Sequence, residues 1–209
     1  MSDFSGSGGA AAVKTIQSEL VPITAIAANA QAISSVLDVT GFKNMAVFID
    51  HARDVTTAFV VAGTEYRIQV SENAAGNDNW RTITSVVCDI TAASDIAMDG
   101  DEVVGSTVIE CGATLPAVND IVFFKNATIA NSEWARVVAI VTTGGSESFT
   151  LSDGLTKAQV ALAHMYNKAE QFVITFDVTT FTRMRVIINN NNGSTNQNIV
   201  SRVACITAV

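Results

Sequence analysis

Short runs in which apolar and polar residues alternate recur along most of the chain, and this period of two residues is typical of β-strands. The clearest runs in the first half are NMAVFID, EYRIQVSE and WRTITSVVCDI, and those near the C-terminal end are QFVITFDV, FTRMRVIINN and NIVSRVACITAV. The turn-forming residues of AAGNDNW separate EYRIQVSE from WRTITSVVCDI, so these two runs are predicted to form a long hairpin. The pattern as a whole predicts an all-β protein.

One strand motif occurs twice, once near each end of the chain. Phe42, Met45, Val47 and Ile49, closed by Asp50, reappear as Phe181, Met184, Val186 and Ile188, closed by Asn189. We expect each copy to be a central strand of the same β-sandwich. The alternative is coincidence, because any buried strand needs large apolar residues at near-alternating positions.

The segment between the two copies differs from its flanks in composition and in the pattern of apolar residues. The stretch TAASDIAMDGDEVVGS mixes acidic and small residues without a sustained period, which indicates a boundary near residue 100. The short strand-like runs STVIECG, DIVFFKN, EWARVVAIV and SFTLSDGL follow, with tight turns between them. They predict a small β-barrel, after which AQVALAHMYNKAE is expected to return the chain through a short helix or an irregular crossing.

These patterns predict an antiparallel, jelly-roll-like β-sandwich that is built from both ends of the chain and interrupted by an inserted small β-barrel. The sandwich is assigned to residues 13–100 and 168–209, and the barrel to residues 101–167. The last three strands are expected to form a meander, since sequential antiparallel strands usually neighbour one another. Residues 1–12 are mostly Gly, Ser and Ala and predict a flexible arm. A tandem of two β domains is the alternative.

Composition and charge exclude several classes of protein. Apolar residues make up 48% of the chain and charged residues only 15%, so there is ample material for a core. The net charge of -8 opposes binding to nucleic acid, because phosphate contacts need Lys and Arg. No apolar run is long enough for a membrane span, and the N-terminal segment lacks the basic start and apolar run of a secretory signal. We therefore expect synthesis in a cytoplasm and a soluble product.

Residues with reactive side chains are few and widely spaced. Cys88, Cys111 and Cys205 each lie in an apolar run and are expected to be small buried hydrophobic residues. His51 and His164 lie at strand boundaries and are expected to face solvent or to cap turns. Neither a nucleophile motif nor the ligand spacing of a zinc site is present, so the sequence predicts no catalytic residue, no bound metal and no cofactor.

The acidic stretch 95–102 does not have the ligand spacing of an EF-hand loop, and a solvated linker is the simpler interpretation. The most unusual local composition is the run of four Asn residues from 189 to 192. It predicts a polar loop that either ends the sandwich or contacts a sugar or a neighbouring subunit. Trp80 and Trp134 each begin a strand and either anchor a core or stack on carbohydrate. The candidate interaction residues are Phe4, Trp134, Asn190, Asn191 and Asn192.

Four segments together resemble a group of tailed-bacteriophage virion proteins: GTEYRIQVSENAAGNDNWRTI, NDIVFFKNATIANSEWARVV, AEQFVITFDV and RMRVIINNNNGSTNQNIVSRVACITA. The resemblance implies a non-enzymatic structural protein of the virion, such as a capsid cement or decoration protein or another head-tail accessory protein. It also implies a homo-oligomer whose partners are major capsid or tail proteins. The resemblance supplies no functional residues.

Three other functions remain open at this point. A carbohydrate-binding or receptor-binding module would use Trp134 and the Asn-rich loop. A tail tube protein would assemble into rings. A hydrolase would need a pair of carboxylates that no motif in the sequence reveals.

Overall fold

The computed structural model describes most of the chain, and the described residues are 14–16, 19–54, 63–73, 75–77, 79–88, 91–112, 114–143, 146–160, 164–192 and 198–208. The predicted arm, with Phe4, lies outside them. The described part consists of strands and one short 3-10 helix, η1 (Ile129–Asn131), and holds no helix that could cross a membrane. The all-β prediction is confirmed.

The strands are β1 (Lys14–Ile16), β2 (Val21–Ile26), β3 (Gln31–Ile33), β4 (Leu37–Asp38), β5 (Asn44–Arg53), β6 (Thr64–Ser71), β7 (Arg81–Val87), β8 (Asp95–Ala97), β9 (Val108–Cys111), β10 (Ile121–Lys125), β11 (Glu133–Thr143), β12 (Ser146–Leu151), β13 (His164–Asp177), β14 (Arg183–Asn190) and β15 (Ile199–Ala208). Every pairing between them is antiparallel.

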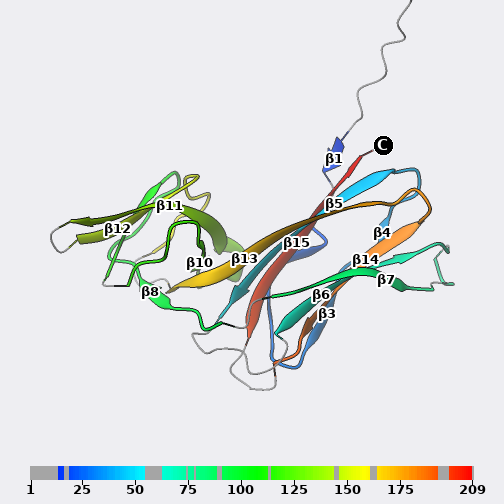
Figure 1. Ribbon diagram of the computed structural model, residues 1–209, viewed down its shortest axis with the longest axis horizontal. Helices are drawn as coiled ribbons and strands as arrows, with labels where there is room; N and C mark the ends of the chain where they lie inside the picture. Colours follow the sequence, from blue (N-terminus) through cyan, green and yellow to red (C-terminus); the bar gives the residue numbers. More distant parts are fainter. Residues whose placement is uncertain are drawn as a thin grey trace, which may run out of the picture.

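One lobe of the molecule is a β-sandwich (Figure 1). Its first sheet contains β5, with β15 on one side and the second half of β13 on the other, and β1 and β2 extend it beyond β15. Its second sheet has the order β3-β14-β6-β7, with β4 also paired to β14. The apolar inner faces of the two sheets form one core. The predicted hairpin of EYRIQVSE and WRTITSVVCDI is confirmed as β6 and β7.

The repeated motif lies at the centre of this core. Its first copy is in β5 and its second is in β14, so the two copies occupy facing sheets. The Met, Val and Ile side chains of both copies are at most 2% exposed, and Phe42 and Phe181 pack against the same core. The prediction that each copy is a central strand of one sandwich is confirmed.

The second lobe is a small β-barrel. Its wall runs through β13, β10, β11, β12 and β9. The strand β8 pairs with β13 on one side. On the other side the chain at β8 meets β9 through a β-bridge between Met98 and Cys111 and a hydrogen bond from Gly112 N to Ala97 O, and this closes the wall. Its interior is filled by large apolar side chains, among them Phe124, Phe149 and Met165. The predicted inserted barrel is confirmed, whereas its boundaries at residues 101 and 167 stay a prediction.

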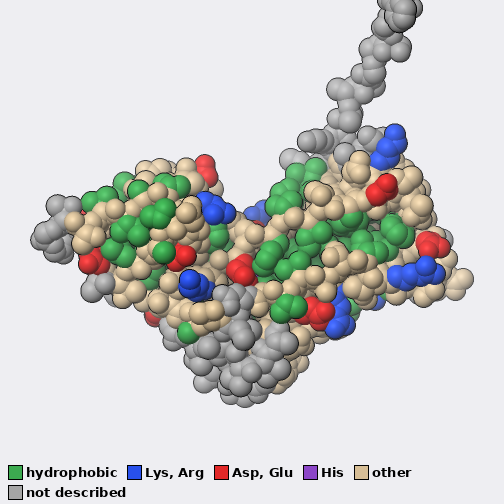
Figure 2. Space-filling view, in the orientation of Figure 1, with side chains coloured by type: hydrophobic (Ala, Val, Ile, Leu, Met, Phe, Trp, Pro, Cys, Tyr) green, Lys and Arg blue, Asp and Glu red, His purple; other side chains and the backbone are tan. Residues whose placement is uncertain are grey.

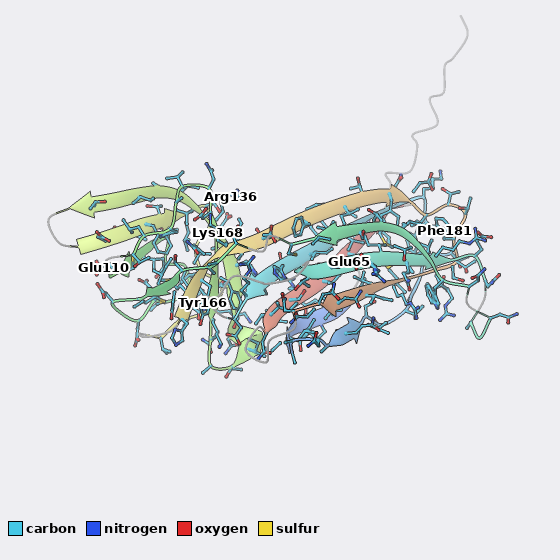
Figure 3. All side chains as sticks on the ribbon, turned by 60° about the horizontal axis from the view of Figure 1, so that its bottom comes forward. Glu65, Glu110, Arg136, Tyr166, Lys168 and Phe181 are labelled. Atoms are coloured by element: carbon cyan, nitrogen blue, oxygen red, sulfur yellow. The ribbon has the colours of Figure 1, made fainter. Side chains whose placement is uncertain are left out.

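The strand β13 runs through both lobes (Figures 1 and 3). Its first residues pair with β8 and β10 in the barrel, and its later residues pair with β5 in the sandwich. The register against β10 shifts between the pairs Phe123–Tyr166 and Ile121–Ala169, and Lys168 has a φ of 61°. This is a β-bulge, which bends the strand where it leaves the barrel.

One sequence prediction is wrong, and another is narrowed. The last three strands do not form a meander, since β13 and β15 both pair with β5 while β14 lies in the facing sheet. Short connections cross between the sheets because each amphipathic strand must bury its apolar face against the other layer. The segment AQVALAHMYNKAE was expected to cross through a short helix or irregularly; its described part holds no helix, and from His164 onward it is strand β13, paired with β8 and β10.

The acidic stretch 95–102 was expected to be a solvated linker, and this is only partly right. Asp95 and Asp99 are exposed, but Ile96 and Met98 between them are buried in the barrel interior. The stretch therefore contributes β8 to the wall of the barrel.

Equivalent positions in the two motif copies should have equivalent effects on stability. We expect Ile49→Ala and Ile188→Ala each to lower the free energy of unfolding by about 2–5 kcal/mol, because each deletes a fully buried side chain. The matched control is Ile33→Ala in β3, which is 52% exposed and should change stability by less than about 1 kcal/mol. Urea unfolding followed by fluorescence measures all three. A large loss in only one motif copy would contradict the equivalence.

Candidate functional site

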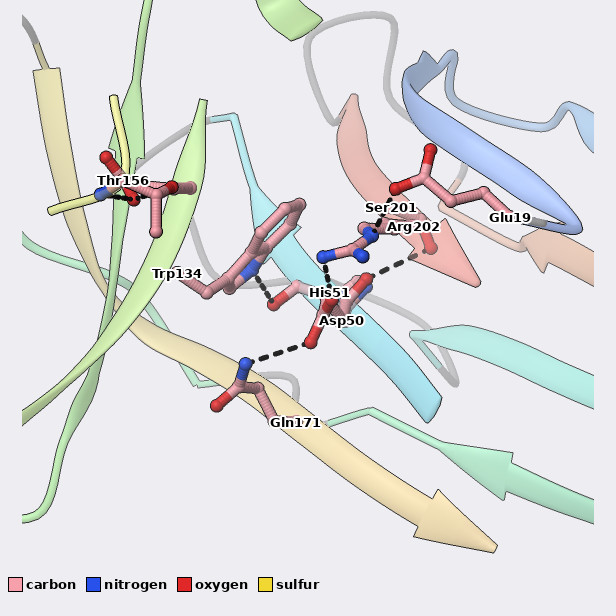
Figure 4. Close-up of polar contacts among 9 residues, drawn as sticks. Glu19, Asp50, His51, Trp134, Thr156, Gln171, Ser201 and Arg202 are labelled. Carbon is pink, nitrogen blue, oxygen red and sulfur yellow. Dashed lines mark hydrogen bonds and ion pairs between the residues drawn. The ribbon is translucent and has the colours of Figure 1, made fainter. Parts of the chain in front are cut away.

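Consecutive residues of β5 point to opposite sides of the first sheet and begin two neighbouring sites. Figure 4 shows the contacts of Asp50 with Gln171 and Arg202 in the outer one. Asp50 faces outward, toward the barrel. His51 shares its inward face with Ile49 and Val47, and it is 0% exposed. The outer site is a pocket between the lobes, and the inner site is a polar cluster between the two sheets.

The outer site, which we call the junction pocket, has a volume of about 430 Å³ and is lined by residues of both lobes. The barrel contributes Trp134 and Lys157, and the sandwich contributes Glu19, Asp50 and Arg202. Figure 2 shows the notch between the lobes. A mixture of one aromatic ring with charged groups of both signs suits a polar ligand.

Trp134 lies half-buried at the start of β11. Its indole Nε1 donates a hydrogen bond to the backbone oxygen of His51 at 3.0 Å, and its ring centroid lies 4.8 Å from that of Phe123. The tryptophan thus fastens the barrel to β5 while one part of it lines the pocket. Trp80, also half-buried, lies against Arg185, whose guanidinium carbon is 4.2 Å from the ring centroid.

A row of polar side chains crosses the outward face beneath the pocket. Gln171 Nε2 donates to Asp50 Oδ1 at 2.9 Å, and Arg202 Nη1 lies 3.7 Å from Asp50 Oδ2. Arg202 Nε also pairs with Glu19 at 2.7 Å. Burial raises the pKa of Asp50, and the bond from Gln171 and the charge of Arg202 oppose this rise. The row fixes the floor of the pocket as an ion-paired surface.

Glu133, the neighbour of Trp134 in β11, is a third acid that lines the junction pocket, besides Glu19 and Asp50. Its two oxygens accept hydrogen bonds from the backbone N–H and hydroxyl of Thr156, from Lys157 N and from Gln159 Nε2. These bonds hold the loop 156–159 against the barrel. The carboxylate is already engaged as an acceptor, and this supports a structural role for it rather than that of a general base.

The inner site is a row of polar residues across the first sheet: Glu170 of β13 is paired with His51, and His51 with Ser201 of β15. Tyr66 reaches this row from the facing sheet. Its hydroxyl lies 2.9 Å from His51 Nδ1 and donates to Ser201 Oγ at 2.9 Å, and Ser201 in turn donates to the backbone oxygen of Asp50.

The direction of this chain of hydrogen bonds fixes the tautomer of His51. A backbone carbonyl can only accept, so the single hydroxyl proton of Ser201 goes to it, and the proton of Tyr66 goes to Ser201. His51 Nδ1 must therefore carry a proton and donate it to Tyr66. The lone pair of His51 Nε2 is left over, and this buried atom has no hydrogen-bond partner among the described residues.

Burial dominates the ionisation of both ring side chains. It lowers the pKa of His51 to about 3, with a further contribution from the charge of Arg53, and this keeps the imidazole neutral. Burial likewise raises the pKa of Tyr66 well above its usual value, and nearby Cys88 adds to the rise. The expectation that His51 faces solvent or caps a turn is wrong, because His51 lies on the same side of β5 as Val47 and Ile49, which point into the core.

Two of the three Asn residues singled out from the sequence are inside the protein. Asn190 is 1% exposed, and its Nδ2 donates to the backbone oxygens of Ile26 and Ala27. Asn192 is 0% exposed and donates to Asn190 Oδ1 at 2.6 Å. Of these three residues, only Asn191 is exposed.

The remaining reactive residues are dispersed. His164 begins β13 at the barrel surface and pairs with Asp95 at 2.9 Å. Cys88, Cys111 and Cys205 are all buried, as the sequence predicts. Burial raises the pKa values of Cys111 and Cys205 to about 11, so these two thiols are poor nucleophiles.

No protein-family model matches the chain, and no curated protein matches it. Two solved structures align over almost its whole length. The first is VP17, a capsid protein of bacteriophage P23-77, with 9% identity, 94% of this chain and 99% of that chain covered, and a TM-score of 0.21. The second is the mavirus penton protein, with 10% identity, 92% and 100% coverage, and a TM-score of 0.19. These scores are too low for either likeness to bear on fold or function.

The hydroxyl of Tyr66 should be needed for stability. We expect Tyr66→Phe to lower the free energy of unfolding by about 1–3 kcal/mol, because His51 Nδ1 and Ser201 would each lose a buried partner. The matched control is Tyr166→Phe, a change in the only other tyrosine, which should cost less than about 1 kcal/mol. Chemical denaturation at neutral pH compares them. Equal effects of the two variants would contradict the assigned network.

Proposed function

We propose that this chain is a non-enzymatic structural protein of a tailed-phage virion, which assembles on the capsid or at the head-tail surface with copies of itself and with major capsid or tail proteins. The observation that carries the proposal is an apolar strip on the outward face of the first sheet. The strip lies in two rows across β13, β5 and β15: Val173, Phe48 and Ala204 in one, and Ala46 and Ile206, with Thr175 as the one hydroxyl residue, in the next.

An outward sheet face that meets only water normally carries polar side chains. Here Val173 is 60% exposed, and Phe48, Ala46 and Ile206 line an open groove of about 380 Å³. Hydrophobic side chains gather on the sandwich lobe in Figure 2. Exposed apolar surface of this kind is typical of a protein-protein contact. It supports assembly as the role of this face.

The occupant that we propose for the groove is the N-terminal arm of a neighbouring copy. The strand β1 pairs with Ile206 and its neighbours at the end of β15, beside the groove. Residues 1–12 precede β1 in the chain and carry one aromatic side chain, Phe4, among small residues. Exchange of such arms between copies is a common route to symmetric oligomers.

Self-association of the purified full-length protein tests this function. We expect concentration-dependent oligomers in analytical ultracentrifugation. Val173→Asp should weaken association at least about tenfold, because the interface would have to bury an unpaired charge. Deletion of residues 1–12 should weaken it at least as much, because the contacts of the arm are lost. Val141→Asp is the control, because Val141 is 46% exposed in β11 of the barrel. A monomeric wild type at all concentrations, or a Val173→Asp variant that assembles normally, would falsify the proposal.

A second candidate function is binding of carbohydrate or a receptor glycan in the junction pocket. The specific observation is the half-buried Trp134 ring beside Gln171, Asp50 and Arg202 in one pocket. An aromatic face with hydrogen-bonding groups around it is suited to a sugar ring.

A glycan array separates this candidate from the first. Binding through the pocket should be lost in Gln171→Ala, which removes a pocket donor without disturbing the packing of Trp134 on Phe123. It should be kept in Gln69→Ala, since Gln69 lies in β6 of the other sheet. If the wild-type protein binds no glycan, the pocket has no such role.

A further inference from the structure

Three residues that are far apart in the sequence place metal-binding atoms close together inside the sandwich. They are His51 of β5, Glu170 of β13, and Cys88, which follows β7. One ligand atom from each lies within 4.8 Å of those of the other two. His51 and Cys88 are buried and Glu170 is partly buried. Zinc was set aside from the sequence because no two of these residues have ligand spacing, and only the fold brings them together.

The hydrogen bonds around His51 prepare it as a ligand. The Nδ1–H of His51 donates a hydrogen bond to the Tyr66 hydroxyl oxygen, so the free lone pair is on Nε2, and that atom is buried without a hydrogen-bond partner among the described residues. A buried acceptor without a partner is costly. In metal sites the ligating histidine usually donates its other ring N–H to a protein group, and the bond to Tyr66 supplies this feature.

The ligand types select the class of ion. A thiolate, an imidazole and a carboxylate are the donors that zinc takes in proteins, whereas magnesium and calcium prefer oxygen alone. Deprotonated Cys88 and Glu170 would together balance the charge of one divalent ion.

We propose that His51 Nε2, Cys88 Sγ and the Glu170 carboxylate bind one zinc-class divalent ion. In a tetrahedral site with bonds of 2.0–2.3 Å, ligand atoms lie roughly 3.5 Å apart, so small side-chain rotations complete the site. Three protein ligands leave the fourth position to water. His51 and Glu170 belong to the first sheet, and Cys88 adjoins the second through its bond from N to Thr64 O. The ion therefore links the two sheets next to the barrel.

Cobalt(II) provides the direct test, because a thiolate bound to cobalt gives a charge-transfer absorption band. Titration of the tag-free, chelator-treated full chain should give this band with one cobalt per chain, and zinc should displace it. Zinc should also raise the unfolding temperature of the wild type. We expect Cys88→Ala to abolish the band and His51→Gln to weaken binding at least about tenfold, as loss of one of three ligands requires.

The matched control is Cys205→Ala, because Cys205 is an equally buried cysteine of the same core outside the cluster. It should keep both the cobalt band and the stabilisation by zinc. Absence of the band in the wild type at saturating cobalt overturns the proposal without reference to any variant. A band that persists in Cys88→Ala, or that disappears equally in Cys205→Ala, also overturns it.

Discussion

The continuity of β13 is the constraint on which the rest of the structure depends. Its first half closes the barrel between β8 and β10, and its second half pairs with β5 in the sandwich. Because a single strand takes part in both lobes, the bulge at Lys168 determines which of its residues face the interior of each lobe. Met165 points into the barrel, whereas Phe172 packs on the sandwich core. The core between the lobes, which includes Phe123 and Ala169, then fills the bend.

The same alternation along β13 and β5 also points polar residues into the sandwich at the end that adjoins the barrel. The inward row of β13 and β5 is apolar at Phe172 and Ile49 and becomes polar one step further, at Glu170 and His51. Burial of such groups is costly unless their hydrogen bonds are made, and the chain from His51 through Tyr66 and Ser201 to a backbone oxygen gives each N–H and O–H along it an acceptor. The direction of that chain leaves the lone pair of His51 Nε2 without a partner among the described residues.

The alternation of apolar and polar residues was sufficient to predict the all-β class, the β6–β7 hairpin, the inserted barrel and the central place of both motif copies. It was also sufficient, in principle, to place His51 inside, since that residue continues the inward series of Val47 and Ile49. The residues around His51 could not be predicted from the sequence, because Tyr66 and Cys88 come close to it only through the packing of the two sheets against each other. Sheet order is likewise not encoded in local periodicity, and this is why the predicted meander fails.

The junction also explains how a barrel of this size is held. A unit of roughly 60 residues buries too little surface to be stable by itself with any margin. Here the bond from Trp134 Nε1 to the backbone of His51, and the ion pair of Lys125 with Asp54, add contacts from the barrel to β5 and the residue that follows it. Both contacts reach the end of β5 that carries the polar cluster. A bound ion that held this end of β5 in place would therefore also hold in place the strand on which the barrel is anchored.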